Sequence, residues 1–286
     1  LLATACKDGS LDPSATDGTQ DPTQDPTQDP RDPADPGDPN CVEKIGLNKM
    51  SANSEVIIGD NTWASTSSIT DAMIKANAQA TVYVKMNGSR CTGFLVNNDM
   101  IMTNNHCIGS PSEAQGVIVR FDWVSSSGSY KQYTCDEFVM TNYSLDFTLV
   151  KCKNSPGKNH PKVVLADFAG RTGDQIYLTH QNCDYRNGAY CLPTQKISTG
   201  VLLGSNSTQI KHDADTLGGS SGSPIFDKGS HKVVGIHNAG LNHGPNNGGT
   251  NYGIPMYRIV DHLKSAYPHV NITSSSSRSP AYDVCD

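Results

Sequence analysis

The sequence predicts an all-β domain that follows an extended, Pro-rich segment. From about residue 54, short apolar runs alternate with turns rich in Gly, Asn and Ser, and long helical patterns are scarce. The runs fall at 56–58, 81–85, 93–96, 116–119, 147–150, 175–178 and 233–236. This rhythm is typical of a sandwich or a barrel, and it leaves room for two helices, near 69–76 and near 255–266.

The chain divides into three regions. Residues 1–6, Leu-Leu-Ala-Thr-Ala-Cys, resemble the end of a bacterial lipoprotein signal peptide, in which small residues precede a cysteine that is lipidated. A remnant of an ordinary signal peptide, or a free thiol at Cys6, fits the same residues. Residues 7–40 repeat Asp-Pro and contain almost no apolar side chains, so we expect a disordered, extended tether. Residues 41–286 are predicted to form the folded domain.

Length and composition narrow the classes of function. With 36% hydrophobic residues among 286, the chain can build one sizeable core, or two small lobes that share one. A net charge of −6 without a Lys/Arg stripe argues against nucleic-acid binding. No apolar run approaches the roughly 18 residues of a membrane-spanning helix. The cysteines form no C-x-x-C pair, so we expect neither a metal nor a cofactor.

Cysteine usage indicates the compartment. Nine cysteines are scattered along the chain, which a reducing cytosol does not explain and disulfides in an oxidising compartment do. Apart from Cys6, the number is even. We therefore expect an exported protein, either secreted or held at a bacterial cell envelope by a lipid anchor at Cys6.

Three motifs supply the groups that acyl transfer from a peptide requires. Ser221 lies in Gly-Gly-Ser-Ser-Gly-Ser-Pro at 218–224. Its flanking glycines permit a tight turn in which the N–H groups of Gly219 and Ser221 form an oxyanion hole. His106 lies just before the second of two cysteines that end a predicted hairpin. Asp146 opens an apolar strand, where a carboxylate needs a bonding partner.

The order His106, Asp146, Ser221 resembles the trypsin/chymotrypsin superfamily and differs from the orders in subtilisins and α/β-hydrolases. Over about residues 54–268 the sequence is similar to the bacterial branch that includes the V8-type glutamyl endopeptidases. The similar segments are Val56-Ile57-Ile58-Gly59-Asp60, Ser-Gly-Ser-Pro and Gly235-Ile236-His237. The resemblance implies two six-stranded antiparallel β-barrels with a catalytic triad between them, and a serine endopeptidase that acts on proteins or peptides. We expect a C-terminal helix and a monomer.

Ser220 departs from one part of that superfamily. Mammalian digestive members carry Asp immediately before the nucleophile, where it pairs with a new N-terminus after zymogen cleavage. With Ser220 in that place, the switch should be absent. The Pro-rich segment is therefore interpreted as a tether rather than as an inhibitory propeptide.

The residues of the pocket for the P1 side chain give two conflicting signals. Asp215 lies six residues before Ser221, which is the offset of the aspartate that selects Lys or Arg in trypsin-like enzymes. His237 and Thr216 instead occupy the places of the histidine and hydroxyl that glutamyl endopeptidases use, and Gly240 is assigned to the same pocket. The balance favours Lys or Arg at P1, with acidic or neutral residues as alternatives. The simplest other role for Asp215 is a structural hydrogen bond to nearby backbone.

The other eight cysteines allow 105 pairings, and their places along the chain favour Cys91–Cys107, Cys135–Cys152, Cys183–Cys191 and Cys41–Cys285. Only the first pair follows from a motif, and the connectivity of the other six cysteines stays open. The first closes the hairpin before His106, and the second flanks Asp146. The third closes a short loop, and the fourth joins the ends of the folded domain.

Two other functions fit the same motifs. A protease-like binding module that has lost catalysis would keep the fold, and an esterase would use the same triad on esters. A protein that has lost catalysis would not be labelled at Ser221 by a fluorophosphonate, which tests the first alternative. The relative turnover of peptides and esters tests the second.

Overall fold

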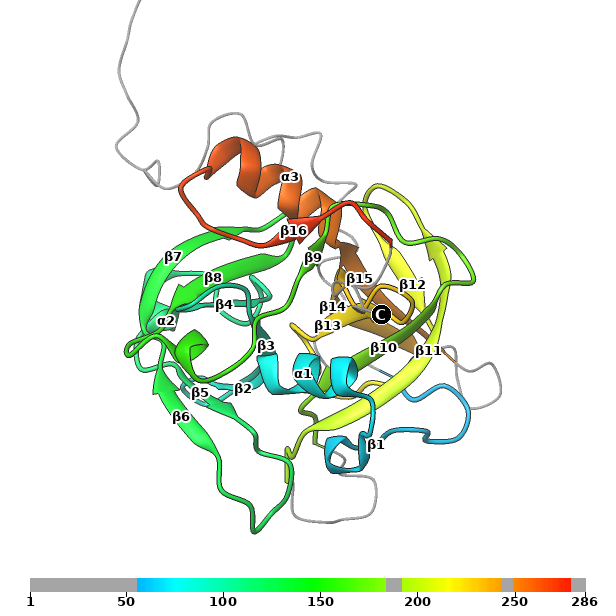
Figure 1. Cartoon of the computed structure of the whole chain (residues 1–286), viewed down its shortest axis with the longest axis horizontal. Helices are drawn as coiled ribbons and strands as arrows, with labels where there is room; N and C mark the ends of the chain where they lie inside the picture. Colours follow the sequence, from blue (N-terminus) through cyan, green and yellow to red (C-terminus); the bar gives the residue numbers. More distant parts are fainter. Residues whose placement is uncertain (1–55, 184–191, 243–248, 279–286) are drawn as a thin grey trace, which may run out of the picture.

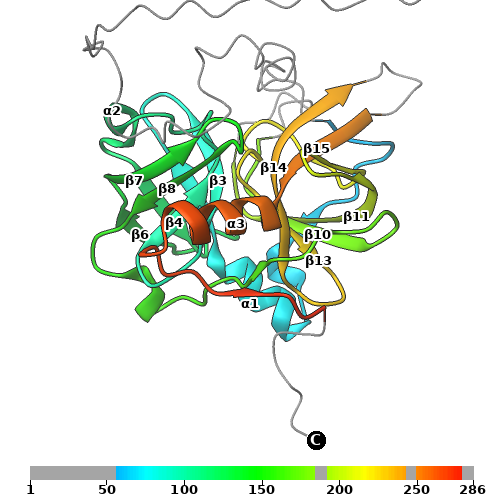
Figure 2. The same cartoon turned by 90° about the horizontal axis from the view of Figure 1, so that it is seen from above.

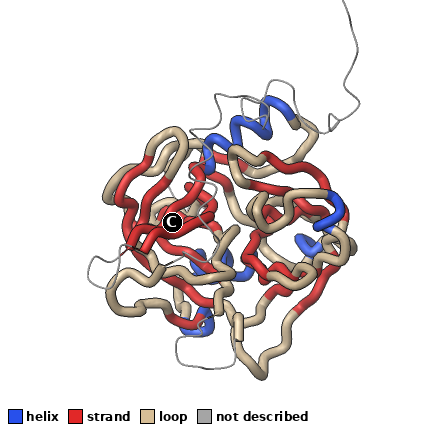
Figure 3. The backbone as a smooth tube through the Cα atoms, turned by 180° about the vertical axis from the view of Figure 1, so that it is seen from behind, coloured by secondary structure: helices blue, strands red, loops and turns tan. Residues whose placement is uncertain are grey.

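The strands of the molecule gather into two sheets, which occupy the two halves of Figure 1. The computed structural model describes residues 56–183, 192–242 and 249–278. Viewed from behind, strands make up much of the described chain in both halves, and helices are few and peripheral (Figure 3). The predicted segments 1–6 and 7–40 lie outside the described residues.

The first lobe is a seven-stranded antiparallel sheet in the order β6-β5-β2-β3-β4-β8-β7. Its strands are β2 (Thr81–Lys85), β3 (Arg90–Leu95), β4 (Met100–Thr103), β5 (Ile118–Phe121), β6 (Lys131–Thr134), β7 (Glu137–Asn142) and β8 (Phe147–Lys151). Apolar side chains that include Val82, Leu95, Ile101, Val119 and Phe121 fill its interior.

No strand pairing closes this first sheet within the described residues, although a six-stranded barrel was expected. The edges are fastened in another way. The disulfide Cys135–Cys152 links the residue after β6 to the residue after β8, and Lys153 N donates to Thr134 O at 2.9 Å. A covalent bond and one backbone hydrogen bond therefore take the place of a ladder between β6 and β7.

The second lobe contains a closed barrel of six antiparallel strands in the order β13-β10-β11-β12-β15-β14, because β14 pairs back onto β13. These strands are β10 (Gln175–His180), β11 (Lys196–Ser205), β12 (Ile210–His212), β13 (Pro224–Asp227), β14 (Val233–Asn242) and β15 (Gly249–Pro255). The short strands β1 (Ala64–Ser65), β9 (Leu165–Ala166) and β16 (Ser274–Ser275) pair at its margins. This lobe matches the expected six-stranded barrel.

Two helices connect the lobes. Helix α1 (Ala72–Ala80) begins where the Asp71 carboxylate accepts the N–H groups of Met73 and Ile74, and it leads directly into β2. Helix α3 (Met256–Ala266) follows β15 and crosses both lobes in the view from above (Figure 2). The remaining helical turns are η2 (Thr66–Ser68), α2 (Pro111–Ala114) and η3 (Pro156–Lys158). In the part of the chain that the structure describes, no helix is long and apolar enough to cross a bilayer.

The largest core cluster is shared by both lobes and α3. It combines Phe94 and Phe147 of the first lobe with Tyr177 and Phe226 of the barrel, whose rings stack at 4.8 Å between centroids. The apolar face of α3 covers this cluster. Burial of this size holds the two lobes in one fixed arrangement, which a site divided between them needs.

Six of the seven predicted strand runs overlap strands, but residues 56–58 form none. Val56 exchanges two hydrogen bonds with the Asn251 side chain, at 3.3 and 2.8 Å. Ile58 N donates to Asp215 Oδ1 at 2.8 Å. Buried side chains, rather than a neighbouring strand, therefore satisfy this extended backbone.

Candidate active site

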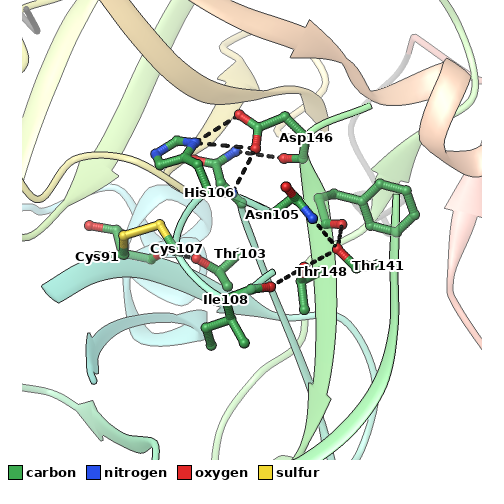
Figure 4. Close-up of polar contacts among 12 residues, drawn as sticks. Cys91, Thr103, Asn105, His106, Cys107, Ile108, Thr141, Asp146 and Thr148 are labelled. Carbon is green, nitrogen blue, oxygen red and sulfur yellow. Dashed lines mark hydrogen bonds and ion pairs between the residues drawn. A yellow bond between two sulfur atoms is a disulfide. The ribbon is translucent and has the colours of Figure 1, made fainter. Parts of the chain in front are cut away.

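The structure brings His106 and Asp146 into direct contact. His106 Nδ1 lies 2.9 Å from Asp146 Oδ2 and 3.2 Å from Oδ1, and the backbone N–H of His106 also donates to Oδ1 at 3.1 Å (Figure 4). The carboxylate is buried, whereas the histidine side chain is 32% exposed. This arrangement fixes the ring and leaves one edge of it accessible.

Asp146 is held by the turn between β7 and β8. Its backbone adopts a left-handed conformation (φ 41°), which Asp tolerates better than most residues. The Asn104 side chain donates to its carbonyl at 2.9 Å, and Asn142 Oδ1 accepts Leu145 N at 2.9 Å. Local polar side chains thus stabilise a turn that aims the carboxylate at His106.

The disulfide Cys91–Cys107 fastens the segment that carries the histidine. It joins β3 to the residue after His106, while Thr103 Oγ1 donates to Thr92 O at 2.8 Å across the same hairpin. Figure 4 shows this disulfide beside the His106–Asp146 pair. Two of the four predicted disulfides, Cys91–Cys107 and Cys135–Cys152, are formed in the structure. Cys183 is also disulfide-bonded, but its predicted partner Cys191 lies outside the described residues, as do Cys41, Cys285 and Cys6.

The serine loop docks onto that hairpin. Thr92 N donates to Ser221 O at 2.8 Å, which places the serine beside the strand that begins near Cys91. Gly222 has φ +85°, and a Cβ there would lie 2.1 Å from Thr92 O and 2.5 Å from Thr103 Oγ1. Only glycine permits this approach, and it packs the loop that carries Ser221 against the hairpin that leads to His106.

The carbonyl groups of the loop are anchored, which orients its N–H groups. Gly218 O accepts Cys183 N at 3.3 Å, and Ser220 O accepts Ser223 N at 2.9 Å. Because the C=O and N–H of a trans peptide point in opposite directions, the N–H groups of Gly219 and Ser221 point away from these anchors. Gly219 has φ +106°, which again requires glycine. The N–H groups of the two predicted oxyanion donors, Gly219 and Ser221, therefore have fixed directions.

Asp215 has other partners than a P1 side chain. Its carboxylate accepts Ile58 N, Thr62 N and Thr62 Oγ1, each at 2.8 Å, and the residue is 1% exposed. The prediction that Asp215 binds a Lys or Arg side chain finds no support, because both oxygens already fasten the segment before β1. This is the structural role that the sequence left open.

The other predicted pocket residues lie close together on the barrel. His237 on β14 exchanges backbone hydrogen bonds with Gly222 and Ser223, both at 2.9 Å. Its Nδ1 lies 3.2 Å from His212 Nε2, and both rings are buried. Burial lowers the pKa of His212 well below 6.5, and the charges of His237 and His180 lower it further. Sequence reasoning named His237 but missed this pair.

Asn251 organises the same region and was also missed. Its side chain accepts Thr216 Oγ1 at 2.8 Å and donates to Ala214 O at 2.8 Å, and its backbone pairs with Gly240 across β14 and β15. A buried Asn in the middle of a strand carries no signal of its own in a single sequence. Within the described residues, no group of three or more His, Cys, Asp or Glu side chains is placed to hold a metal.

Comparison with known protein families identifies the class of this domain. A model of the trypsin-like peptidase domain matches residues 91–236, a span that includes His106, Asp146 and Ser221. The chain belongs to this family of trypsin-like peptidases and lies near its V8-type members.

The relatives are distant in sequence but align with more than two thirds of this chain. A glutamyl endopeptidase of Staphylococcus epidermidis is 24% identical over 213 residues, which cover 68% of this chain and 70% of the relative. Secreted RxLR effector protein 73 of Plasmopara viticola is 25% identical over 215 residues, 69% of this chain. The aligned part covers 52% of that effector, so the chain spans about half of its length.

Solved structures share the fold. A Glu endopeptidase in complex with MPD has a TM-score of 0.58 at 23% identity, covering 74% of this chain and 100% of that one. Rv3671c of Mycobacterium tuberculosis H37Rv has a TM-score of 0.52 at 16% identity, covering 76% and 100%. These likenesses establish a trypsin-like architecture.

Proposed function

We propose that the protein is an exported serine endopeptidase in which His106, Asp146 and Ser221 form the catalytic triad. The observation that carries the proposal is the buried Asp146 carboxylate on His106 Nδ1 at 2.9 Å. The carboxylate favours the tautomer that carries its proton on Nδ1, and in that neutral tautomer Nε2 can act as the general base. Membership of the trypsin-like peptidase family supports the same assignment.

The reaction would proceed through an acyl-enzyme. His106 takes the proton of Ser221 Oγ as that oxygen attacks the scissile carbonyl, and Asp146 stabilises the imidazolium. The tetrahedral oxyanion accepts the N–H groups of Gly219 and Ser221, whose peptides are already oriented by their anchored carbonyls. His106 then gives its proton to the leaving amine, and water releases the acyl group.

We further propose an acidic residue at P1 in place of Lys or Arg. Three observations support it. Asp215 is occupied by hydrogen bonds, His237 lies next to the serine loop with His212 behind it, and Thr216 lies on the facing segment. With His212 donating to His237 Nδ1, the Nε2–H of His237 can donate to a carboxylate. Relatives named as glutamyl endopeptidases support the same preference.

Export is supported by the disulfides of the described region, which persist in oxidising compartments. One relative is named as a secreted effector. A lipid anchor at Cys6 stays a prediction from the sequence. Flotation of the expressed protein with membrane vesicles, compared between the wild type and Cys6→Ser, would test it.

The assignment of the triad is tested by Ser221→Ala. We expect kcat on casein to fall on the order of a million-fold, as when the nucleophile of other triads is deleted. A fluorophosphonate should label the wild type and leave the alanine variant unlabelled. Equal cleavage by the two proteins, or an unlabelled wild type, would contradict the proposal and favour a binding module.

The P1 preference is tested with chromogenic peptides that differ only in a P1 Glu, Asp, Lys, Arg or Phe. We expect Glu to be cleaved best. His237→Leu should lower kcat/KM for Glu about 10- to 100-fold, the worth of one charge-assisted hydrogen bond, and leave Phe unchanged. Asp215→Asn is the matched control and should not alter the ranking. If the wild type cleaves best after Lys and Asp215→Asn loses that preference, the proposed acidic preference is wrong and Asp215 selects basic P1 residues.

A further inference from the structure

A buried histidine that the mechanism does not use contacts the residue before the nucleophile. His180 ends β10, is fully buried, and places Nδ1 3.0 Å from Ser220 Oγ. Its Nε2 lies 2.8 Å from Ser198 Oγ on β11. Ser198 Oγ in turn donates to Asp215 O at 2.8 Å. We call Ser220, His180 and Ser198 the histidine brace.

The hydrogen bonds of the brace define one tautomer. Ser198 has a single hydroxyl proton, which goes to Asp215 O, so Ser198 must accept from His180 Nε2–H. Nδ1 of His180 is then unprotonated and accepts the Ser220 hydroxyl. Ser220 Oγ also accepts Leu217 N at 3.3 Å. Ser220 can therefore accept from Leu217 while its own hydroxyl proton is donated to His180 Nδ1. The brace is fully satisfied with a neutral histidine that carries its proton on Nε2.

The surroundings of the ring favour that neutral form. Burial lowers the pKa of His180 well below 6.5, and the charges of Lys196 and His237 lower it further. The edge of the Trp63 ring packs against it, with 6.0 Å between centroids. The brace therefore keeps one hydrogen-bonding pattern across the neutral pH range.

The brace joins the serine loop to the segment that precedes the predicted P1 pocket. On one side, Ser220 belongs to the peptide that supplies the N–H of Ser221. On the other side, Asp215 precedes the pocket residue Thr216. Ser220 stands where digestive relatives carry the aspartate of an ion pair, and its side chain here is neutral. A rotation of Ser220 would move the Ser221 N–H away from the oxyanion.

From this geometry we propose that His180 is a positioning residue, which holds the loop 218–221 in its oxyanion-binding conformation through Ser220 without an ion pair. The proposal rests on the function proposed above and adds to it the device that keeps the site preformed. Were Ser221 inert, the wild type itself would show no turnover, so failure of the function is seen before any brace variant is compared.

Two substitutions at His180 separate the two contacts. Asn places an amide oxygen near the position of Nδ1 and can keep the Ser220 hydrogen bond. Gln reaches the position of Nε2 and keeps Ser198 instead. We expect His180→Gln to lower kcat about 10- to 100-fold with KM within about two-fold, because a displaced oxyanion donor acts on the transition state. His180→Asn should stay within about three-fold of the wild type.

Ser220→Ala removes the same contact from the other side and keeps the test valid if His180→Gln does not fold. It should match His180→Gln in kcat, and the double variant should be no slower than the slower single one, since both remove one interaction. Ser205→Ala, which changes another serine of β11 outside the brace, is the control and should leave kcat within about three-fold. Rates are normalised to active sites titrated at Ser221, and thermal melting records folding.

A further readout distinguishes positioning from simple stability. A peptide trifluoromethyl ketone, which forms an oxyanion on Ser221, should bind the Gln variant about 10- to 100-fold more weakly, whereas a product peptide binds it normally. The proposal is overturned if His180→Gln keeps the wild-type kcat. It is equally overturned if Asn and Gln lose activity alike, or if the effects of His180→Gln and Ser220→Ala simply multiply.

Discussion

The two lobes are stabilised by different means, and the proposed triad draws its residues from both. The first lobe carries His106 and Asp146, and its open sheet is fastened by the disulfides Cys91–Cys107 and Cys135–Cys152. The second lobe carries Ser221 and closes through a ladder between β13 and β14. Its interior holds buried histidines. The first-lobe residues of the proposed site are therefore held next to a disulfide, and the second-lobe residues next to buried imidazoles.

The largest effect should come from breaking the first-lobe half of the site. We expect Asp146→Asn to lower kcat by about 10⁴, because an amide holds His106 in the wrong tautomer. Steady-state hydrolysis of the best P1 peptide measures it. Asp122→Asn is a matched control, since Asp122 is another first-lobe aspartate with positive φ (60°). Comparable losses of kcat in both variants would show that the effect is not specific to the carboxylate on His106.

The contact between the lobes is tested next. Gly222→Ala places a methyl group 2.1 Å from Thr92 O on a backbone with φ +85°. Strain and overpacking together should cost roughly 4 kcal/mol of unfolding free energy, and Ser221 should lose its contact with the His106 hairpin. Urea unfolding and kcat measure the two effects. Gly218→Ala has open space and should be nearly neutral; a similar penalty there would contradict the docking argument.

Removal of a disulfide distinguishes the two fastenings of the first lobe. Cys135→Ala with Cys152→Ala opens a loop of 17 residues and should cost about 3 kcal/mol. Activity at 25 °C should survive, because that bond joins sheet edges away from His106. Cys91→Ala with Cys107→Ala should cost a similar amount and lower kcat as well. Thermal melting and kcat, measured on both pairs, check the difference.

The smallest effect, taken for one histidine and one pH unit, should be the pH dependence of the second lobe. Burial holds the pKa of His180 and of His212 well below 6.5 in the folded state. Above the unfolded value both states are neutral and stability is unaffected. Below it the unfolded chain binds more protons, so stability is lost as the pH falls toward the folded pKa, by about 1.4 kcal/mol per pH unit for each histidine.

Urea unfolding between pH 5 and pH 7.5 measures this slope. His212→Gln should reduce it by the share of one histidine. An unchanged slope in that variant would mean that His212 titrates alike in both states.

Several elements were predictable because their signals are local. The alternation in 81–85, 147–150 and 175–178 predicted β2, β8 and β10, and the apolar face of 255–266 predicted α3. Flanking glycines identified the serine loop, and a cysteine pair identified the hairpin of His106. The same alternation could have shown His180 facing inward, since it follows Ile176 and Leu178 with period two.

Other features had no such signal. Residues 56–58 read as a strand, yet their partners are the side chains of Asn251 and Asp215, about 150 to 200 residues away. Asp215 read as a specificity residue because its offset from Ser221 was right, but offset does not say which way a side chain points. The sequence also did not predict that the β13–β14 ladder closes one sheet while the other stays open, because strand pairing between distant segments is not a local property.

The sequence by itself determined the residue types, their chain order and the local turns: a histidine framed by cysteines, an aspartate that opens a strand, and a serine among glycines. These follow from the allowed conformations of each residue and from short-range periodicity. Tertiary structure alone decided that Asp146 reaches His106, that Asp215 fastens residues 58–62, and that His180 contacts Ser220. Those contacts join residues far apart in the chain, and only packing of the two lobes sets the distances between them.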